Sequence, residues 1–159
     1  MEFSLRKSIW NPWNWWKPKN KNMTDLPKNK KIILFDGVCN LCDSSIQFII
    51  KHDKNDLFRF VALQSDLGQE IIKFIGVDIS KTDSIILYEP GKAYYYKAEA
   101  ALKIAKELGG IYVAISWFSI LPKGLTNSVY DYIAKNRYEW YGKKDACLIP
   151  TPELKAKFL

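Results

Sequence analysis

The sequence predicts an α/β domain built on a mixed β-sheet, and three observations support this class. From Lys31 onward, segments with strand and helix patterns follow in the order β-α-β-α-β-β-α. A Cys-x-x-Cys pair, Cys39 and Cys42, lies at the first strand-to-helix junction. The first βαβ unit requires a right-handed parallel crossover, whereas the later hairpin adds antiparallel strands, so the sheet is expected to be mixed.

Each expected element has its own signal in the sequence. Short apolar runs indicate strands, apolar residues at helical spacing indicate amphipathic helices, and Glu89-Pro90-Gly91-Lys92 indicates a hairpin turn. The expected strands are 31–35, 58–63, 84–88 and 94–97, and the expected helices are about 39–53, 66–75, 98–108, 111–121 and 125–136. In the last helix, one face is expected to point into the core through Leu125, Val129, Tyr132 and Ile133.

Charge and composition divide the chain into three parts. Residues 1–30 are expected to form an irregular, basic and aromatic N-terminal extension, residues 31–150 the α/β domain with its C-terminal helices, and residues 151–159 a tail. Residues 1–31 hold eight Lys and Arg against two acidic residues, whereas the rest of the chain holds sixteen against fifteen. The nearly neutral body argues against nucleic acid as a partner, because phosphate binding needs a basic face on the domain.

The N-terminal extension offers a second kind of partner. Four of the six tryptophans lie within residues 1–31, and together with the lysines they suit peripheral contact with a membrane surface. An aromatic strap over the domain's own apolar surface, or a non-native extension before Met23, would explain the same composition. The longest apolar stretch, 111–121, is shorter than the roughly 20 residues of a membrane-spanning helix. No secretory signal is recognised, so a cytoplasmic location is expected, with peripheral membrane contact as an addition to it.

The spacing of Cys39 and Cys42 is the spacing that thiol–disulfide exchange requires. Free backbone amides and the helix dipole at a helix start favour a thiolate on Cys39, and Cys42 one turn later is within reach to close a disulfide. We therefore expect Cys39 to attack a substrate disulfide and Cys42 to resolve the mixed disulfide. The uncharged Asn40-Leu41 pair gives the thiolate little electrostatic support, which favours a reductant or a moderate exchanger over a strong oxidant.

Three further residues are expected to support the dithiol. Asp36 either caps the helix through its backbone amides or shuttles a proton for Cys42. Gly37 permits a tight strand-to-helix turn. Arg137 either pairs with a core carboxylate or lies near the dithiol, where its charge would favour the thiolate.

The remaining metal-binding residue types do not form a recognisable site. Cys147 and His52 could complete a zinc site with the dithiol, but the usual second Cys-x-x-Cys or histidine pair is missing. No metal and no other cofactor is therefore expected. Three cysteines do not form a structural disulfide framework, and a close pair suits a reducing compartment.

The segment Asp36-Gly37-Val38-Cys39-Asn40-Leu41-Cys42 resembles the Asp-x-x-Cys-x-x-Cys signature of the DCC thiol–disulfide oxidoreductases, a thioredoxin-like family also classified as a domain of unknown function. Further pieces match the family's pattern, namely 61–65, 98–110, Asn136-Arg137-Tyr138, Gly142 and Cys147. The resemblance covers about Lys31 to Pro150 and implies a thioredoxin-like three-layer fold with a helical C-terminal extension. It departs from thioredoxins near Lys81-Thr82-Asp83, where those proteins carry a cis-proline that helps to position substrate.

These observations predict a protein thiol–disulfide oxidoreductase of the protein-disulfide reductase type. The expected partners are a disulfide-containing protein or small thiol substrate and an electron donor that the sequence does not identify. The alternative is a non-catalytic interaction or membrane-surface module, whose dithiol would be vestigial or would bind a metal.

Overall fold

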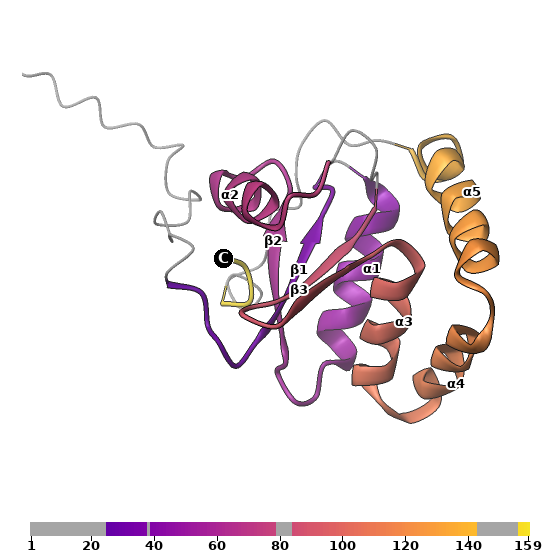
Figure 1. The fold of residues 1–159 in the computed structure, drawn as a ribbon, viewed down its shortest axis with the longest axis horizontal. Helices are drawn as coiled ribbons and strands as arrows, with labels where there is room; N and C mark the ends of the chain where they lie inside the picture. Colours follow the sequence, from indigo (N-terminus) through magenta and orange to yellow (C-terminus); the bar gives the residue numbers. More distant parts are fainter. Residues whose placement is uncertain (1–24, 38, 79–83, 143–155) are drawn as a thin grey trace, which may run out of the picture.

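The computed structural model describes residues 25–37, 39–78, 84–142 and 156–159, and within these ranges the elements follow the predicted order (Figure 1). The strands are β1 (Lys31–Phe35), β2 (Phe58–Ala62), β3 (Ile86–Glu89) and β4 (Ala93–Tyr96). The helices are α1 (Asn40–His52), α2 (Asp66–Ile75), α3 (Lys97–Leu108), η3 (Gly110–Tyr112), α4 (Val113–Ser116), η4 (Trp117–Ile120) and α5 (Lys123–Tyr141). The predicted α/β class, with a mixed sheet and a helical C-terminal part, is confirmed.

The four strands form one sheet in the order β2-β1-β3-β4. β1 pairs in parallel with β2, with Ile33 opposite Phe60, and antiparallel with β3, with Ile33 opposite Leu87. β3 and β4 form the expected hairpin, which places β4 at the edge. The central strand β1 therefore delivers its C-terminal end, and the loop that follows it, to the start of α1.

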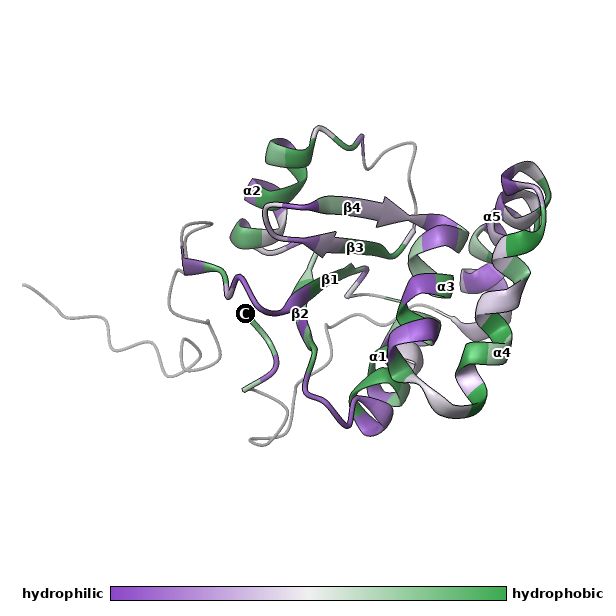
Figure 2. Ribbon diagram, turned by 60° about the horizontal axis from the view of Figure 1, so that its bottom comes forward, coloured by the Kyte–Doolittle hydropathy of each residue, from purple (hydrophilic) through white to green (hydrophobic). Residues whose placement is uncertain are grey.

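Helices cover both faces of the sheet, and alternate residues of β1 supply both cores, because successive side chains of a strand point to opposite faces. Ile32 and Leu34 contribute to the core on the α2 side, together with Ile71 of that helix. Ile33 and Phe35 contribute to the core shared with α1 and α3. Figure 2 shows this apolar sheet between the helices. The layers are those of a thioredoxin-like fold.

The last residues of the chain lie beside β2 and form part of the core. The Phe60 amide donates to the carbonyl of Lys157 at 2.9 Å, and the Leu159 amide donates to the carbonyl of Phe60 at 3.0 Å. The Phe158 ring lies 5.6 Å from the ring of Phe60 between centroids, and 6.0 Å from that of Phe35. Residues 157–159, which the sequence assigned to a tail, are thus paired with the sheet.

The predicted orientation of the last helix is wrong. The residues expected to face the core are exposed, with exposed fractions of 54% for Leu125, 54% for Val129, 63% for Tyr132 and 41% for Ile133. Polar contacts orient α5 instead: the Tyr130 hydroxyl accepts from the Ile85 amide at 3.1 Å, and Asp131 pairs with Lys97 at 2.9 Å. These contacts turn another face of the helix toward the domain.

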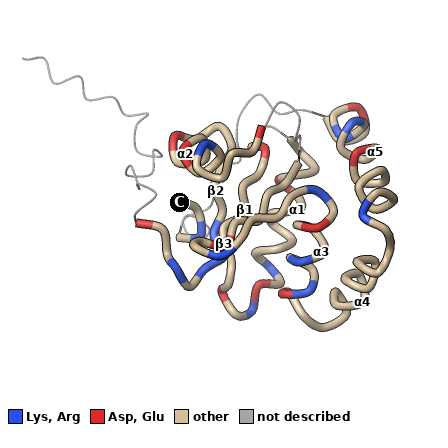
Figure 3. The backbone as a smooth tube through the Cα atoms, in the orientation of Figure 1, with Lys and Arg blue, Asp and Glu red and all other residues tan. Residues whose placement is uncertain are grey.

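The segment expected as one helix over 111–121 forms three short helical turns, η3, α4 and η4. β-Branched and aromatic residues, which have weak helix propensity, make up much of it, and Gly109-Gly110 and Pro122 bound it. Its large side chains are mostly exposed, including Ile111, Trp117 and Ile120. Figure 3 shows that α4 carries no charged residue, whereas charges of both signs lie on the surrounding elements.

Several predicted features fall outside the described ranges. These are the extension up to residue 24, Cys147, and the segment 81–83 where thioredoxins have their cis-proline. In the part of the chain that the structure describes, no helix has the length and apolar character needed to cross a membrane.

Candidate functional site: the dithiol at the start of helix α1

The two cysteines lie where the sequence places them, between the central strand and the first helix. Cys39 is the N-cap residue of α1, with extended backbone (φ −98°, ψ 122°), and its carbonyl accepts the first helical hydrogen bond from the Asp43 amide at 3.0 Å. Cys42 follows within the first turn. The two cysteines lie 3.3 Å apart, and both are free thiols.

The two thiols differ in electrostatic environment. Burial raises the pKa of Cys42 to about 12, and a hydrogen bond with Cys39 and the charge of Cys39 add to this rise. The Arg137 charge opposes the rise, and the Asp36 charge adds to it. Cys42 therefore keeps its proton at neutral pH and can donate it to the neighbouring sulfur.

The two thiols also differ in exposure. Cys39 is fully buried, whereas Cys42 is partly exposed and lines a hollow on the surface of the domain. The more protected cysteine is thus the one at the helix start, and the more accessible one lies a turn further along α1.

Asp36, the last residue before the dithiol loop, joins three segments of the fold through its carboxylate. Oδ2 accepts from Arg137 Nη2 at 3.0 Å and from the Tyr138 hydroxyl, and Oδ1 accepts from Gln64 Nε2 at 2.8 Å. Gln64 Oε1 in turn accepts from the amide of Gly37 at 3.2 Å. The carboxylate thereby links the end of β1 to the residues after β2 and to α5, a role in addition to the cap and the proton shuttle that the sequence suggested.

Arg137 both pairs with a core carboxylate and lies near the dithiol, the two alternatives that the sequence left open. It is buried, pairs with the carboxylate of Asp36, and lies close enough to Cys42 to lower its pKa. Its guanidinium also lies over the ring of Tyr138, 4.6 Å from the centroid. The charge beside the dithiol is therefore part of an ion pair.

The sequence analysis named Tyr138 and residues 61–65 only as matches to the family pattern and did not identify Tyr138 or Gln64 as site residues. Burial and the hydrogen bond to Asp36 raise the pKa of Tyr138 to about 12, against the opposing effect of Arg137, so its hydroxyl remains a donor. Two signals were available: Tyr138 directly follows Arg137, and Gln64 follows the strand parallel to β1. Parallel strands end at the same sheet edge, which brings Gln64 close to Asp36.

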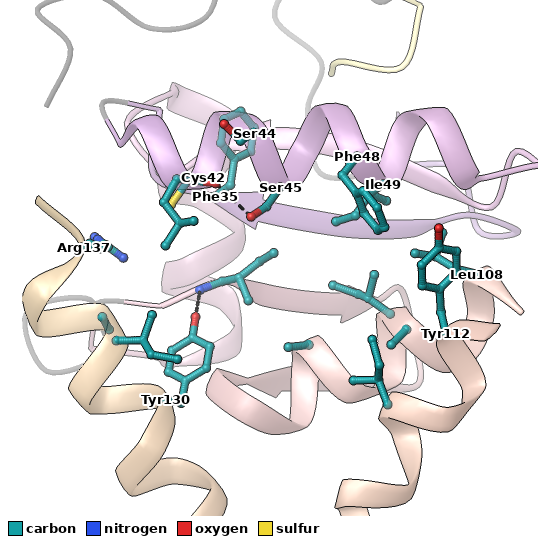
Figure 4. A pocket seen from close by; sticks show the side chains of 18 residues that line it. Phe35, Cys42, Ser44, Ser45, Phe48, Ile49, Leu108, Tyr112, Tyr130 and Arg137 are labelled. Carbon is teal, nitrogen blue, oxygen red and sulfur yellow. Dashed lines mark hydrogen bonds between the residues drawn. The ribbon is translucent and has the colours of Figure 1, made fainter. Parts of the chain in front are cut away.

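A hollow of about 500 Å³ opens beside Cys42, between α1 on one side and α3, α4 and α5 on the other. Figure 4 shows Cys42 and Arg137 at one end of this hollow and Phe48 and Tyr112 at the other. The rings of Phe48 and Tyr112 meet edge to face, 5.2 Å apart. The hollow is therefore elongated, with the dithiol at one end.

His52 is not brought to the dithiol. It lies in the last turn of α1, at the opposite end of the helix from Cys39, where its Nδ1 is 2.7 Å from the carbonyl oxygen of Phe48. Its ring packs against Phe48 and Tyr112. Among the described residues, no three histidine, cysteine or acidic side chains gather in an arrangement that could bind a metal ion.

Fold and site together define a thioredoxin-like α/β protein with a close dithiol at the first strand-to-helix junction. The chain belongs to the DCC1-like thiol-disulfide oxidoreductase family, whose model matches residues 33–143. It is 42% identical over 137 residues to the "Uncharacterized protein YuxK" of Bacillus subtilis (strain 168), which covers 86% of this chain and 99% of the relative. It is 36% identical over 119 residues to the chloroplastic DCC family protein At1g52590 of Arabidopsis thaliana, with 74% of this chain and 69% of the relative covered. No solved structure matches the chain significantly.

Proposed function

We propose that the protein is a thiol–disulfide oxidoreductase that exchanges the Cys39/Cys42 dithiol with substrate disulfides. The observation that carries this proposal is the pair of free thiols 3.3 Å apart at the N-terminus of α1. Membership of a family described as thiol–disulfide oxidoreductases supports the same reaction class. In the reaction, two protein thiols become one disulfide, and the substrate disulfide becomes two thiols.

In this proposal Cys39 is the nucleophile and Cys42 the resolving thiol. Cys39 is the N-cap residue of α1, and the cysteine at the helix N-terminus is the usual nucleophile of a Cys-x-x-Cys pair. The raised pKa of Cys42 supports this order, because the proton stays on the resolving sulfur until the mixed disulfide has formed. Cys42 then attacks the sulfur of Cys39 and releases the second substrate thiol.

Access to Cys39 is part of the proposal. Since Cys39 is fully buried and Cys42 lines the hollow, substrate approaches from the Cys42 side, and the first turn of α1 moves to expose the buried sulfur. The hydrogen bonds of Gln64 to Asp36 and Gly37 hold the end of β1, so the proposed movement is limited to the first turn of α1.

We further propose that Asp36, Gly37 and Arg137 position the dithiol loop. The partners are a disulfide-containing protein or small thiol substrate, and a separate electron donor that reduces the resulting protein disulfide. A reducing compartment such as the cytoplasm would maintain the free thiols seen here.

Turnover of a disulfide substrate tests the proposal. The wild type, Cys39→Ser and Cys42→Ser are compared in a Cys147→Ser background, which removes the third thiol, with a chemical dithiol as electron donor. We expect loss of turnover in both variants, because each lacks one half of the exchange. Equal rates in all three proteins would reject the enzyme and favour the non-catalytic module.

A further inference from the structure

We propose that the hollow beside Cys42 is a substrate subsite for an elongated, uncharged, apolar group carried by a small-molecule disulfide. This inference rests on the proposed exchange reaction and adds a substrate class to it. Three features of the hollow support it: its lining, its size and the position of the sulfur.

The lining is almost entirely apolar. Arg137 alone among the described lining residues is charged, and its guanidinium is paired with Asp36. The apolar lining side chains come from four helices, α1, α3, α4 and α5, and from Phe35 and Ile85 beside the ends of β1 and β3. A charged substrate group would lose its hydration here without gaining a partner.

Three of the hydroxyls in the lining, those of Ser44, Ser45 and Tyr130, are already bonded within the protein. The hydroxyls of Ser44 and Ser45 donate to carbonyls of their own helix at 3.1 and 2.8 Å. The hydroxyl of Tyr130 accepts from the Ile85 amide at 3.1 Å. Between Cys42 and Tyr112 the hollow therefore offers mainly apolar contact area, which favours a hydrocarbon group.

Small side chains on α3 and α5 leave room for the hollow. Ala101 and Ala105 lie one turn apart on α3, and Ala134 lies on α5. The resulting volume of about 500 Å³ falls in the usual range of small-molecule sites, about 300–1,000 Å³. Apolar side chains at its rim, Phe48, Ile115 and Ile133, are 43%, 49% and 41% exposed, so a bound apolar group would remove them from water.

The position of the Cys42 sulfur at one end of the hollow sets the direction in which a substrate would bind. Cys42 and Arg137 lie at that end, and the apolar walls extend from there toward Phe48 and Tyr112. A linear apolar chain bonded to the disulfide would lie along the hollow with its reactive end at the dithiol.

Alkyl pyridyl disulfides test the inference with one leaving group. The protein thiolate attacks the alkyl-bearing sulfur and releases thiopyridone, and the second protein thiol then closes the protein disulfide and releases the alkyl thiol. We compare methyl, butyl and hexyl chains with carboxyethyl and aminoethyl chains. We expect kcat/KM to rise by up to about fourfold for each buried methylene and to remain low for both charged chains.

Two matched variants locate the effect. Ile133→Glu places a charge in the lining, and Val129→Glu places one on the same helix outside the hollow, at a similarly exposed position. We expect Ile133→Glu to abolish the dependence of kcat/KM on chain length. Val129→Glu is expected to keep the full dependence.

The outcomes separate this inference from the proposed function. A rate that is independent of chain length in an active wild type overturns the subsite and leaves the exchange reaction standing. Loss of the length dependence in Val129→Glu as well would also overturn it. If only a peptide disulfide with apolar neighbours is accelerated, the small-molecule class is wrong. Unchanged rates in the Cys39→Ser and Cys42→Ser variants would reject the exchange reaction itself.

Discussion

Arg137 of α5 donates a hydrogen bond across 3.0 Å to the carboxylate of Asp36 at the end of β1, and both side chains are buried. The contact spans 101 residues of sequence and joins the C-terminal helix to the dithiol loop. Because the Leu125 and Val129 side of α5 faces solvent, polar contacts of this kind determine how the helix sits on the domain.

The first prediction concerns this ion pair. Arg137→Met leaves the Asp36 carboxylate buried without its cation and is expected to lower the free energy of unfolding by about 3 kcal/mol. Adding Asp36→Asn removes the stranded charge and is expected to restore part of this loss. Urea denaturation of the single and double variants measures the coupling; strictly additive losses would show that the two residues do not interact energetically.

The second prediction concerns alkaline pH. The pKa of Cys42 is raised from 9.0 to about 12 in the folded protein, so the folded state keeps a proton that the unfolded chain releases. The contribution of the protonated Cys42 thiol to the free energy of unfolding is fully present below pH 9.0. It is lost as the pH rises toward about 12. In the reduced protein, Cys42→Ser is expected to flatten the fall in unfolding free energy over this window.

The same pH series tests a second residue, Tyr138. Tyr138→Phe removes a second group whose pKa is raised, from 10.0 in the unfolded chain to about 12 in the folded protein. Its contribution to the free energy of unfolding is therefore also lost as the pH rises through this range. Denaturation series at increasing pH on the three proteins compare their slopes. A wild-type slope shared by both variants would mean that neither group is coupled to folding in this way.

The order of the elements and the place of the dithiol could be predicted from sequence because both depend on local patterns. Apolar runs and helical spacing located β1 and α2, and Gly76 in left-handed conformation ends α2. The orientation of α5 could not be predicted, because an apolar stripe such as Leu125–Ile133 indicates a face and not the surface it packs on. Contacts between distant residues, Asp36 with Tyr138 above all, depend on the tertiary arrangement.

The third prediction concerns a glycine that no sequence pattern singled out. A Cβ on Gly68 of α2 would lie 2.2 Å from the carbonyl oxygen of Ala62, so the helix approaches β2 more closely than a side chain permits. Gly68→Ala is expected to destabilise the fold by more than about 1 kcal/mol, despite the better helix propensity of alanine. Gly124→Ala on α5, where the space is open, is expected to stabilise by about 0.5–1 kcal/mol. Thermal denaturation compares them, and stabilisation by both would contradict the close packing.

The fourth prediction concerns the end of the chain. Phe158 packs on Phe35 and Phe60 beside β2, so Phe158→Ala is expected to cost about 2–3 kcal/mol of unfolding free energy. Phe74→Ala, at a side chain that is 68% exposed, is expected to change it by less than about 0.5 kcal/mol. Urea denaturation measures both. Equal effects would show that residues 156–159 do not contribute to the core.

The most direct test of the central claim is to trap the mixed disulfide. Cys42→Ser and Cys39→Ser, both in the Cys147→Ser background, are incubated with a disulfide substrate and analysed by intact-protein and peptide mass spectrometry. We expect Cys42→Ser to accumulate a mixed disulfide on Cys39, because the attacking sulfur is present and the resolving one is missing. Accumulation only on Cys42 of the Cys39→Ser variant, or on neither protein, would contradict it.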